Sequence, residues 1–200
     1  MDRIPAVSGI PVRRTIASAT EALSRIAHVR RVEIRVRDRG TPAAIRDGRA
    51  LIGNATVEAI RSGSRVTWLE AGAWYGSEAY TDSAAQTTQE ASRVSSDLDG
   101  LRFRNELRWA QLGTSLLQIE RPRPRSAKES GTAAALDGNL APVRIALVPD
   151  ATGAWVSAAA HLCGKDLYTA RLELRADDMT LVWIVRGPKK DLLIVCRYRA

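Results

Sequence analysis

The chain has 200 residues and a mass of 21.8 kDa, which suits one domain whose core needs no metal or disulfide to hold it together. Its 45% hydrophobic and 26% charged residues are typical of a globular protein, and it contains no run of about 18 apolar residues that could cross a membrane. The net charge is +8 and the pI is near 10.2.

Only four of the 30 basic residues are lysines, and the arginines are spread along the chain. Many arginines alternate with apolar residues, which is typical of the solvent face of a strand. We therefore rank nucleic acid low among the expected partners.

The two cysteines, Cys163 and Cys196, lack a CxxC spacing, and residues 1–12 lack the apolar core of a secretory signal peptide. This combination favours two buried, reduced thiols over a disulfide and predicts a cytoplasmic protein.

Along the chain, residues 1–14 are predicted to be a flexible tail because two prolines and a glycine discourage regular structure. Residues 15–27 are predicted to be a short helix. Ser18 is its expected N-cap, with Glu21 three positions later in a capping-box spacing.

A period of two begins after the helix and predicts strands. In the first, Val32, Ile34 and Val36 alternate with charged residues. Further strands are expected at 49–60, 65–74, 101–109, 114–121, 143–148, 161–174, 180–186 and 192–198, with a turn at 111–113. The strand at 161–174 is expected to have an irregular start, since a glycine within a strand, here Gly164, often marks a bulge. Residues 80–97 are polar, and 122–140 begin with Pro-Arg-Pro-Arg and predict an irregular surface loop.

Eight to ten strands joined as hairpins, each with one solvent-exposed face, predict an antiparallel up-and-down sheet. Closure into a barrel would remove the exposed edges of that sheet. We therefore predict an all-β fold with one short N-terminal helix, in which residues 15–200 form a single barrel domain.

The densest group of functional side chains is H-L-C-G-K-D-L-Y at 161–168, followed by Trp183, Arg186 and G-P-K-K-D at 187–191. This pattern, H-x-C-G-x-D-x-Y and then W-x-V-x-G-P-x-K-D, resembles an uncharacterised lipocalin-like family of bacterial and fungal proteins. The resemblance implies a calycin-like barrel and no particular activity. The Gly-x-Trp common in the first calycin strand is missing between Ala27 and Arg37.

The function predicted for such a barrel is binding of a small hydrophobic or amphipathic ligand. Nine residues share the inward phase of their strands: Val32, Ile34, Val36, Phe103, Leu107, Trp109, Tyr168, Leu172 and Trp183. Six residues are predicted to contact the ligand: His161, Tyr168, Trp183, Trp109, Arg186 and Lys190.

An enzyme on the same scaffold is the first alternative, with His161 as acid or base and Cys163 or Asp166 assisting it. A haem bound through His161 is the second alternative. A neutral, hydrogen-bonded His161 is favoured over either. No zinc-ligand spacing or nucleotide-binding motif is present, so the sequence requires no metal and no cofactor.

The order of the last strands predicts that residues 161–168 and 187–191 share one rim of the barrel. Asp166 and Asp191 suit either a structural role in that rim or a basic rim that receives an anion. The sequence leaves open whether this rim is the mouth or the closed end, and leaves the oligomeric state open as well.

Overall fold

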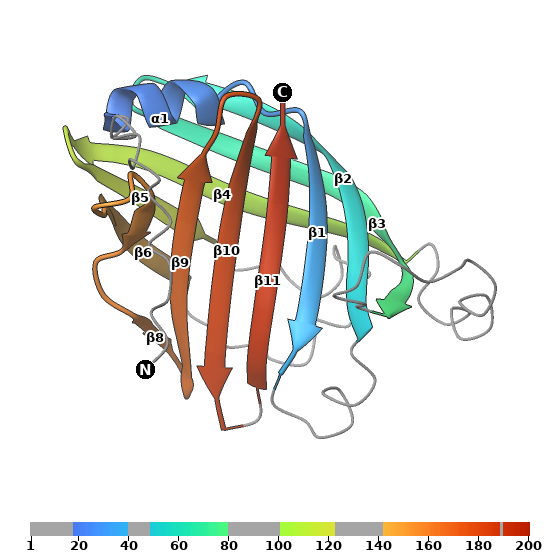
Figure 1. Ribbon diagram of the computed structural model, residues 1–200. Coiled ribbons are helices and arrows are strands. Elements are labelled where there is room, and N and C mark those ends of the chain that lie inside the picture. Colours follow the sequence, from blue (N-terminus) through green and yellow to red (C-terminus); the bar gives the residue numbers. More distant parts are fainter. Residues whose placement is uncertain (1–17, 40–48, 80–100, 123–141, 189) are drawn as a thin grey trace, which may run out of the picture.

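The computed structural model describes residues 18–39, 49–79, 101–122, 142–188 and 190–200, which form one short helix and eleven strands (Figure 1). In chain order the elements are α1 (Ala19–Ile26), β1 (Arg31–Asp38), β2 (Arg49–Ser62), β3 (Arg65–Ala79), β4 (Arg102–Gly113), β5 (Leu116–Arg121), β6 (Val143–Pro149), β7 (Trp155–Ser157), β8 (His161–Cys163), β9 (Asp166–Leu174), β10 (Asp178–Gly187) and β11 (Lys190–Arg199).

The strands form a closed ring in which every pairing is antiparallel. The order is β10-β11-β1-β2-β3-β4-β5-β6-β7-β9, and pairing of β9 with β10 completes a ring of ten strands. The first and last strands are neighbours, because β1 pairs with β11 from Arg31↔Arg199 to Asp38↔Leu192. The predicted all-β, antiparallel, closed barrel is therefore confirmed.

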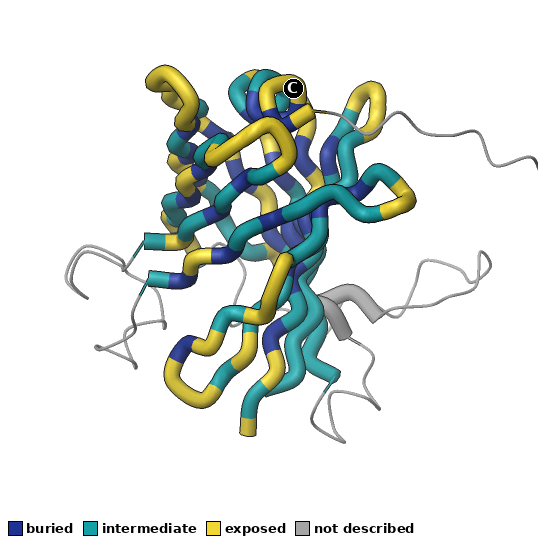
Figure 2. Tube along the Cα trace, turned by 90° about the vertical axis from the view of Figure 1, so that its left-hand side faces the viewer, coloured by how far each residue is buried: buried dark blue, intermediate teal, exposed yellow. Residues whose placement is uncertain are grey.

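The faces of the strands follow the predicted alternation (Figure 2). In β1, Val32 and Ile34 are buried and Val36 is half-buried, whereas Arg31 on the outer face is exposed. All nine residues predicted to point inward belong to the core or pack against it. The register that places apolar side chains inside is thus the predicted one.

Helix α1 lies across one end of the barrel, the end at which β11 finishes (Figure 1). Ser18 caps the helix by accepting a hydrogen bond from the backbone N–H of Glu21 at 3.1 Å, as predicted. The indole Nε1 of Trp68 donates to the carbonyl of Ile26 at 2.8 Å, and the N–H of Ala19 donates to the carbonyl of Thr114 at 3.1 Å. These bonds attach the helix to β3 and to the β4–β5 turn.

The barrel half beneath α1 is filled with aromatic side chains. Trp68 packs edge-on against Trp109, with ring centroids 5.2 Å apart, and lies 4.5 Å from the ring of Tyr198. Trp155 is also fully buried. This packing fills the half of the barrel under the helix, so a cavity has to lie toward the other end.

The irregular start predicted for the strand at 161–174 is a separate short strand and a turn. Residues 161–174 do not form a single strand but a tight hairpin of β8 and β9, with a turn at Gly164 and Lys165. Gly164 has φ +64°, a left-handed conformation that glycine adopts without the steric cost of a side chain. A glycine inside an alternating pattern here marks a turn between two strands.

Other boundaries differ as well. The predicted turn at 111–113 belongs to β4, the actual turn is at Thr114 and Ser115, and β3 extends to Ala79. Strand β7 was missed, because three residues are too few to show a period.

The predicted tail at 1–14 and most of the predicted loop at 122–140 lie outside the described residues. The described helix, eight residues long, is too short to span a membrane.

Candidate ligand-binding cavity

A cavity of about 390 Å³ lies in the half of the barrel away from α1. Its volume falls within the range typical of small-molecule sites. Eleven apolar side chains from seven strands and the residue before β4 line it: Ile34, Val36, Leu51, Trp74, Leu101, Phe103, Leu107, Val143, Trp183, Val185 and Ile194. The wall is therefore mainly aliphatic and aromatic, with a few polar groups whose positions decide what can bind.

The most deeply buried polar group in this wall is Glu70, which is 2% exposed. Tyr198 donates its hydroxyl to Glu70 Oε1 at 2.9 Å, and Asn105 Nδ2 donates to Glu70 Oε2 at 2.8 Å. Burial raises the pKa of Glu70, and these two hydrogen bonds oppose that rise only in part. The carboxyl group can therefore retain its proton at higher pH than an exposed glutamate.

Two neighbours of Glu70 are held in their neutral forms. Burial, together with the nearby Glu70 carboxylate, raises the pKa of Cys196 to about 12 and raises that of Tyr198 well above 10. A thiolate or a phenolate is thus disfavoured here, so Cys196 is not a poised nucleophile. The interior cluster of Glu70, Asn105, Cys196 and Tyr198 can donate or accept hydrogen bonds.

A cation lines the same cavity. Arg121, the last residue of β5, continues the inward phase of Leu117 and Ile119. Its positive charge acts to lower the pKa of Glu70, Tyr168 and Cys196, against the larger effect of burial. No carboxylate of the described residues lies within ion-pairing distance of Arg121.

Of the six predicted ligand contacts, two line the cavity, namely Tyr168 and Trp183. Burial raises the pKa of Tyr168, so its hydroxyl stays protonated. Trp109 is fully buried in the aromatic packing beneath α1 and does not line the cavity. Trp109 lies nearer to the end of the barrel that α1 covers than the cavity does, because β4 runs toward that end.

His161 lies directly across from Tyr168 in the β8–β9 hairpin, and Cys163 lies across from Asp166. His161 and Cys163 therefore lie on the same face of β8, as predicted for a strand. His161 does not line the cavity, and its buried Nε2 has no hydrogen-bond partner among the described residues. Cys163 and Cys196 are both buried and do not form a disulfide, as predicted.

The remaining predicted residues meet at the rim opposite α1. Lys190 Nζ lies 3.1 Å from Asp166 Oδ2, and Asp166 packs against Gly187. Asp191 pairs with Arg39 Nη2 at 2.7 Å and so joins β11 to the end of β1. These contacts place residues 161–168 and 187–191 at one rim, as predicted, and that rim is not the end that the helix covers. Arg186 is exposed.

Glu70, Asn105 and Arg121 were not among the predicted site residues. Each continues the apolar phase of its strand: Glu70 follows Val66 and Trp68 at intervals of two, and Arg121 follows Ile119. A polar residue in the apolar phase was the signal that could have identified them.

The fold and this cavity define a closed antiparallel barrel with an interior of ligand size. Residues 71–200 match a family described as a family of unknown function (DUF6314). Because the match spans more than half of the chain, the chain belongs to this family. No curated protein and no solved structure matches the chain.

Proposed function

We propose that the barrel binds a small amphipathic acid. Its apolar body would lie against Trp183 and the aliphatic wall, and its acidic end would pair with Arg121. The observation that carries the proposal is an apolar cavity lined by a guanidinium group that has no carboxylate partner among the described residues. Because Arg121 is exposed at the end of β5, its guanidinium group is accessible to the acidic end of a ligand whose apolar body lies in the cavity.

The polar groups suit one orientation of this ligand. A carboxylate accepts two hydrogen bonds from a guanidinium group in a fixed geometry. The hydroxyl of Tyr168 adds a donor on the same cavity wall. We also propose that the protein is lipocalin-like and cytoplasmic, because two cysteines that form no disulfide are typical of a reducing compartment.

The test is a titration with a fluorescent amphipathic acid, such as a dansyl-labelled fatty acid, together with native mass spectrometry of protein from its own host. Val185→Trp fills the cavity and should abolish the fluorescence enhancement. Val182→Trp makes the same change on the outer face of β10 and should leave it unchanged. Equal binding by the Val185→Trp variant and the wild type would show that the ligand binds elsewhere.

A second variant separates the acidic end from the apolar body. Arg121→Gln removes the cation from an exposed position at the end of β5, so the fold should persist. Affinity for the fatty acid should fall about tenfold, since a charge-assisted hydrogen bond is worth more than a neutral one. Affinity for the matching fatty alcohol should hardly change. An equal loss for both ligands would count against an anionic end at Arg121.

A further inference from the structure

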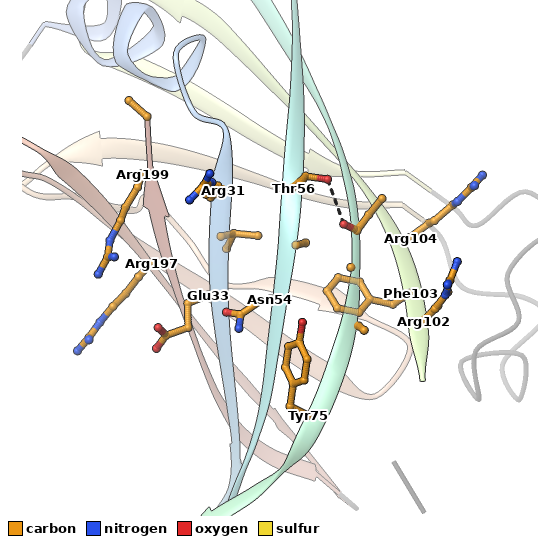
Figure 3. A pocket seen from close by; sticks show the side chains of 16 residues that line it. Arg31, Glu33, Asn54, Thr56, Tyr75, Arg102, Phe103, Arg104, Arg197 and Arg199 are labelled. Carbon is orange, nitrogen blue, oxygen red and sulfur yellow. Dashed lines mark hydrogen bonds between the residues drawn. The ribbon is translucent and has the colours of Figure 1, made fainter. Parts of the chain in front are cut away.

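A second hollow lies on the outer surface of the barrel, across β11, β1, β2, β3 and β4 (Figure 3). Its volume is about 700 Å³, larger than that of the inner cavity. Figure 3 shows the arginines of β1 and β11 on one side of this groove and those of β4 on the other. We call it the arginine groove, after Arg31, Arg197 and Arg199 on the first side and Arg102 and Arg104 on the second.

Small residues make the groove deep. Ala71 and Ala73 point outward from β3, and Gly72 lies between them. A Cβ atom at Gly72 would collide with the backbone of Asn54 and with Ala55, so β2 and β3 approach each other closely there. The floor therefore stays low while long arginine side chains form both sides.

The groove carries a strong positive charge. All five arginines are exposed, and none of them forms an ion pair with a carboxylate of the described residues. The single acidic side chain of the lining, Glu33, accepts a hydrogen bond from Arg35 Nε at 2.7 Å. Five arginines and one glutamate give the groove a net side-chain charge of +4. Such a concentration of charge attracts anions.

One pair of these arginines is placed at a cost to stability. Arg31 is directly opposite Arg199 in the β1–β11 ladder, and like charges in that position destabilise a sheet. A bound anion between the two guanidinium groups would remove this repulsion. The fold thus holds two exposed cations side by side, with no carboxylate partner among the described residues.

We propose that the arginine groove binds a small ligand with several phosphate groups, of the nucleoside polyphosphate class. Planar guanidinium groups bind phosphate oxygens in pairs, and the two sides of the groove can hold successive phosphates. Tyr75, which is 51% exposed, provides the aromatic face on which a base can stack. Asn54 offers an amide to the sugar.

The same features favour a small ligand over a macromolecule. An acidic peptide would need apolar pockets for its side chains, whereas this floor consists of alanine, glycine and backbone. Single-stranded nucleic acid binds to a series of exposed aromatic residues, and the lining has one exposed aromatic residue, Tyr75.

Isothermal titration calorimetry of the full chain at physiological salt tests the proposal. ATP should bind, inorganic tripolyphosphate should bind more weakly, and adenosine should not bind measurably. Arg31→Gln/Arg199→Gln should weaken ATP binding at least tenfold. Tyr75→Ala should weaken binding of ATP but not of tripolyphosphate. The matched control is Arg61→Gln/Arg65→Gln in the exposed β2–β3 hairpin, which removes the same charge outside the groove and should leave affinity unchanged.

A stability measurement accompanies the calorimetry. Because Arg31 and Arg199 repel each other, the double variant should raise the Tm of the free protein by about 1–3 °C. Lost binding together with raised stability cannot come from misfolding. Absence of ATP binding, or equal weakening by the groove variant and its control, overturns the proposal. Tighter, groove-dependent binding of a single-stranded oligonucleotide or an acidic decapeptide also overturns it, in favour of that partner.

Discussion

Glu70 is the only charged side chain that is buried among the described residues. A carboxyl group in such a place loses its hydration, and this loss outweighs the hydrogen bonds from Asn105 and Tyr198. The pKa of Glu70 is raised above its usual 4.5, so the folded protein keeps a proton that the unfolded chain releases. Stability therefore falls as pH rises from about 4.5 through the folded-state pKa.

Glu70→Gln should remove this decline, because glutamine cannot ionise and can still accept a hydrogen bond from Tyr198. As pH rises, the free energy of unfolding of the variant should therefore increase relative to that of the wild type. The gain is about 1.4 kcal/mol for each unit by which the pKa is raised. Urea denaturation between pH 4 and pH 8 measures the difference.

The control for this prediction is Glu58→Gln, which removes a carboxylate from the exposed outer face of β2. Its unfolding free energy should follow that of the wild type at each pH. If Glu70→Gln also follows the wild type throughout, the Glu70 carboxyl group ionises in the folded barrel as it does in water.

For single residues, the sequence predicts whether a side chain points into the barrel better than it predicts the hydrogen-bond partner of that side chain. The alternation placed Tyr168 and Trp183 inside, where they line the cavity. Asn105 also belongs to the apolar phase of β4, but its bond to Glu70 depends on the register between β3 and β4. Two residues 35 positions apart become neighbours only through that register, which no local pattern specifies.

Among the elements, the β8–β9 and β10–β11 hairpins determine the shape of the rim opposite α1. Gly187 is at the end of β10 because a side chain there would overlap the carboxylate of Asp166. That carboxylate in turn pairs with Lys190 across the turn. The two hairpins are thus joined by one close contact and one ion pair.

Gly187→Ala should therefore lower the free energy of unfolding by about 1–3 kcal/mol, because Asp166 has to move and lose Lys190. In the double variant Gly187→Ala/Asp166→Ala the overlap disappears. The losses of unfolding free energy in the two single variants should therefore sum to more than the loss in the double variant. Chemical denaturation of the three variants measures this coupling, which we expect to be about 0.5–2 kcal/mol. Strictly additive losses would show that the alanine fits without moving Asp166.

The same hairpins show what a sequence pattern can specify about an element. Ser18 and Glu21 identified the start of α1 because capping is local chemistry. Gly164 was visible as an interruption, yet a bulge and a two-residue turn are alike in a single sequence. The pairing of β9 decides between them: β9 pairs with β10 from Leu167 to Leu174, and with β7 and β8 over separate parts.

At the scale of the whole molecule, closure explains both the cavity and the arginine groove. Because β11 pairs with β1, the arginines at 197 and 199 lie beside Arg31, although more than 160 positions separate them in the sequence. The arginines are spread evenly along the sequence, yet the ring gathers five of them around one groove. Only the topology brings them together.

Closure also makes β11 the strand whose disruption should cost most. Its neighbours β10 and β1 bond to both of its edges, so a proline within it removes a ladder hydrogen bond and opens the ring. Val195→Pro should lower the free energy of unfolding by at least about 3 kcal/mol. It should also reduce the near-ultraviolet circular dichroism of the buried tryptophans.

Leu162→Pro is the control, because β8 pairs only with β9 and lies outside the ring of ten strands. This variant should lower the free energy of unfolding much less. If the two prolines cost the same, closure through β11 does not govern the stability of the barrel.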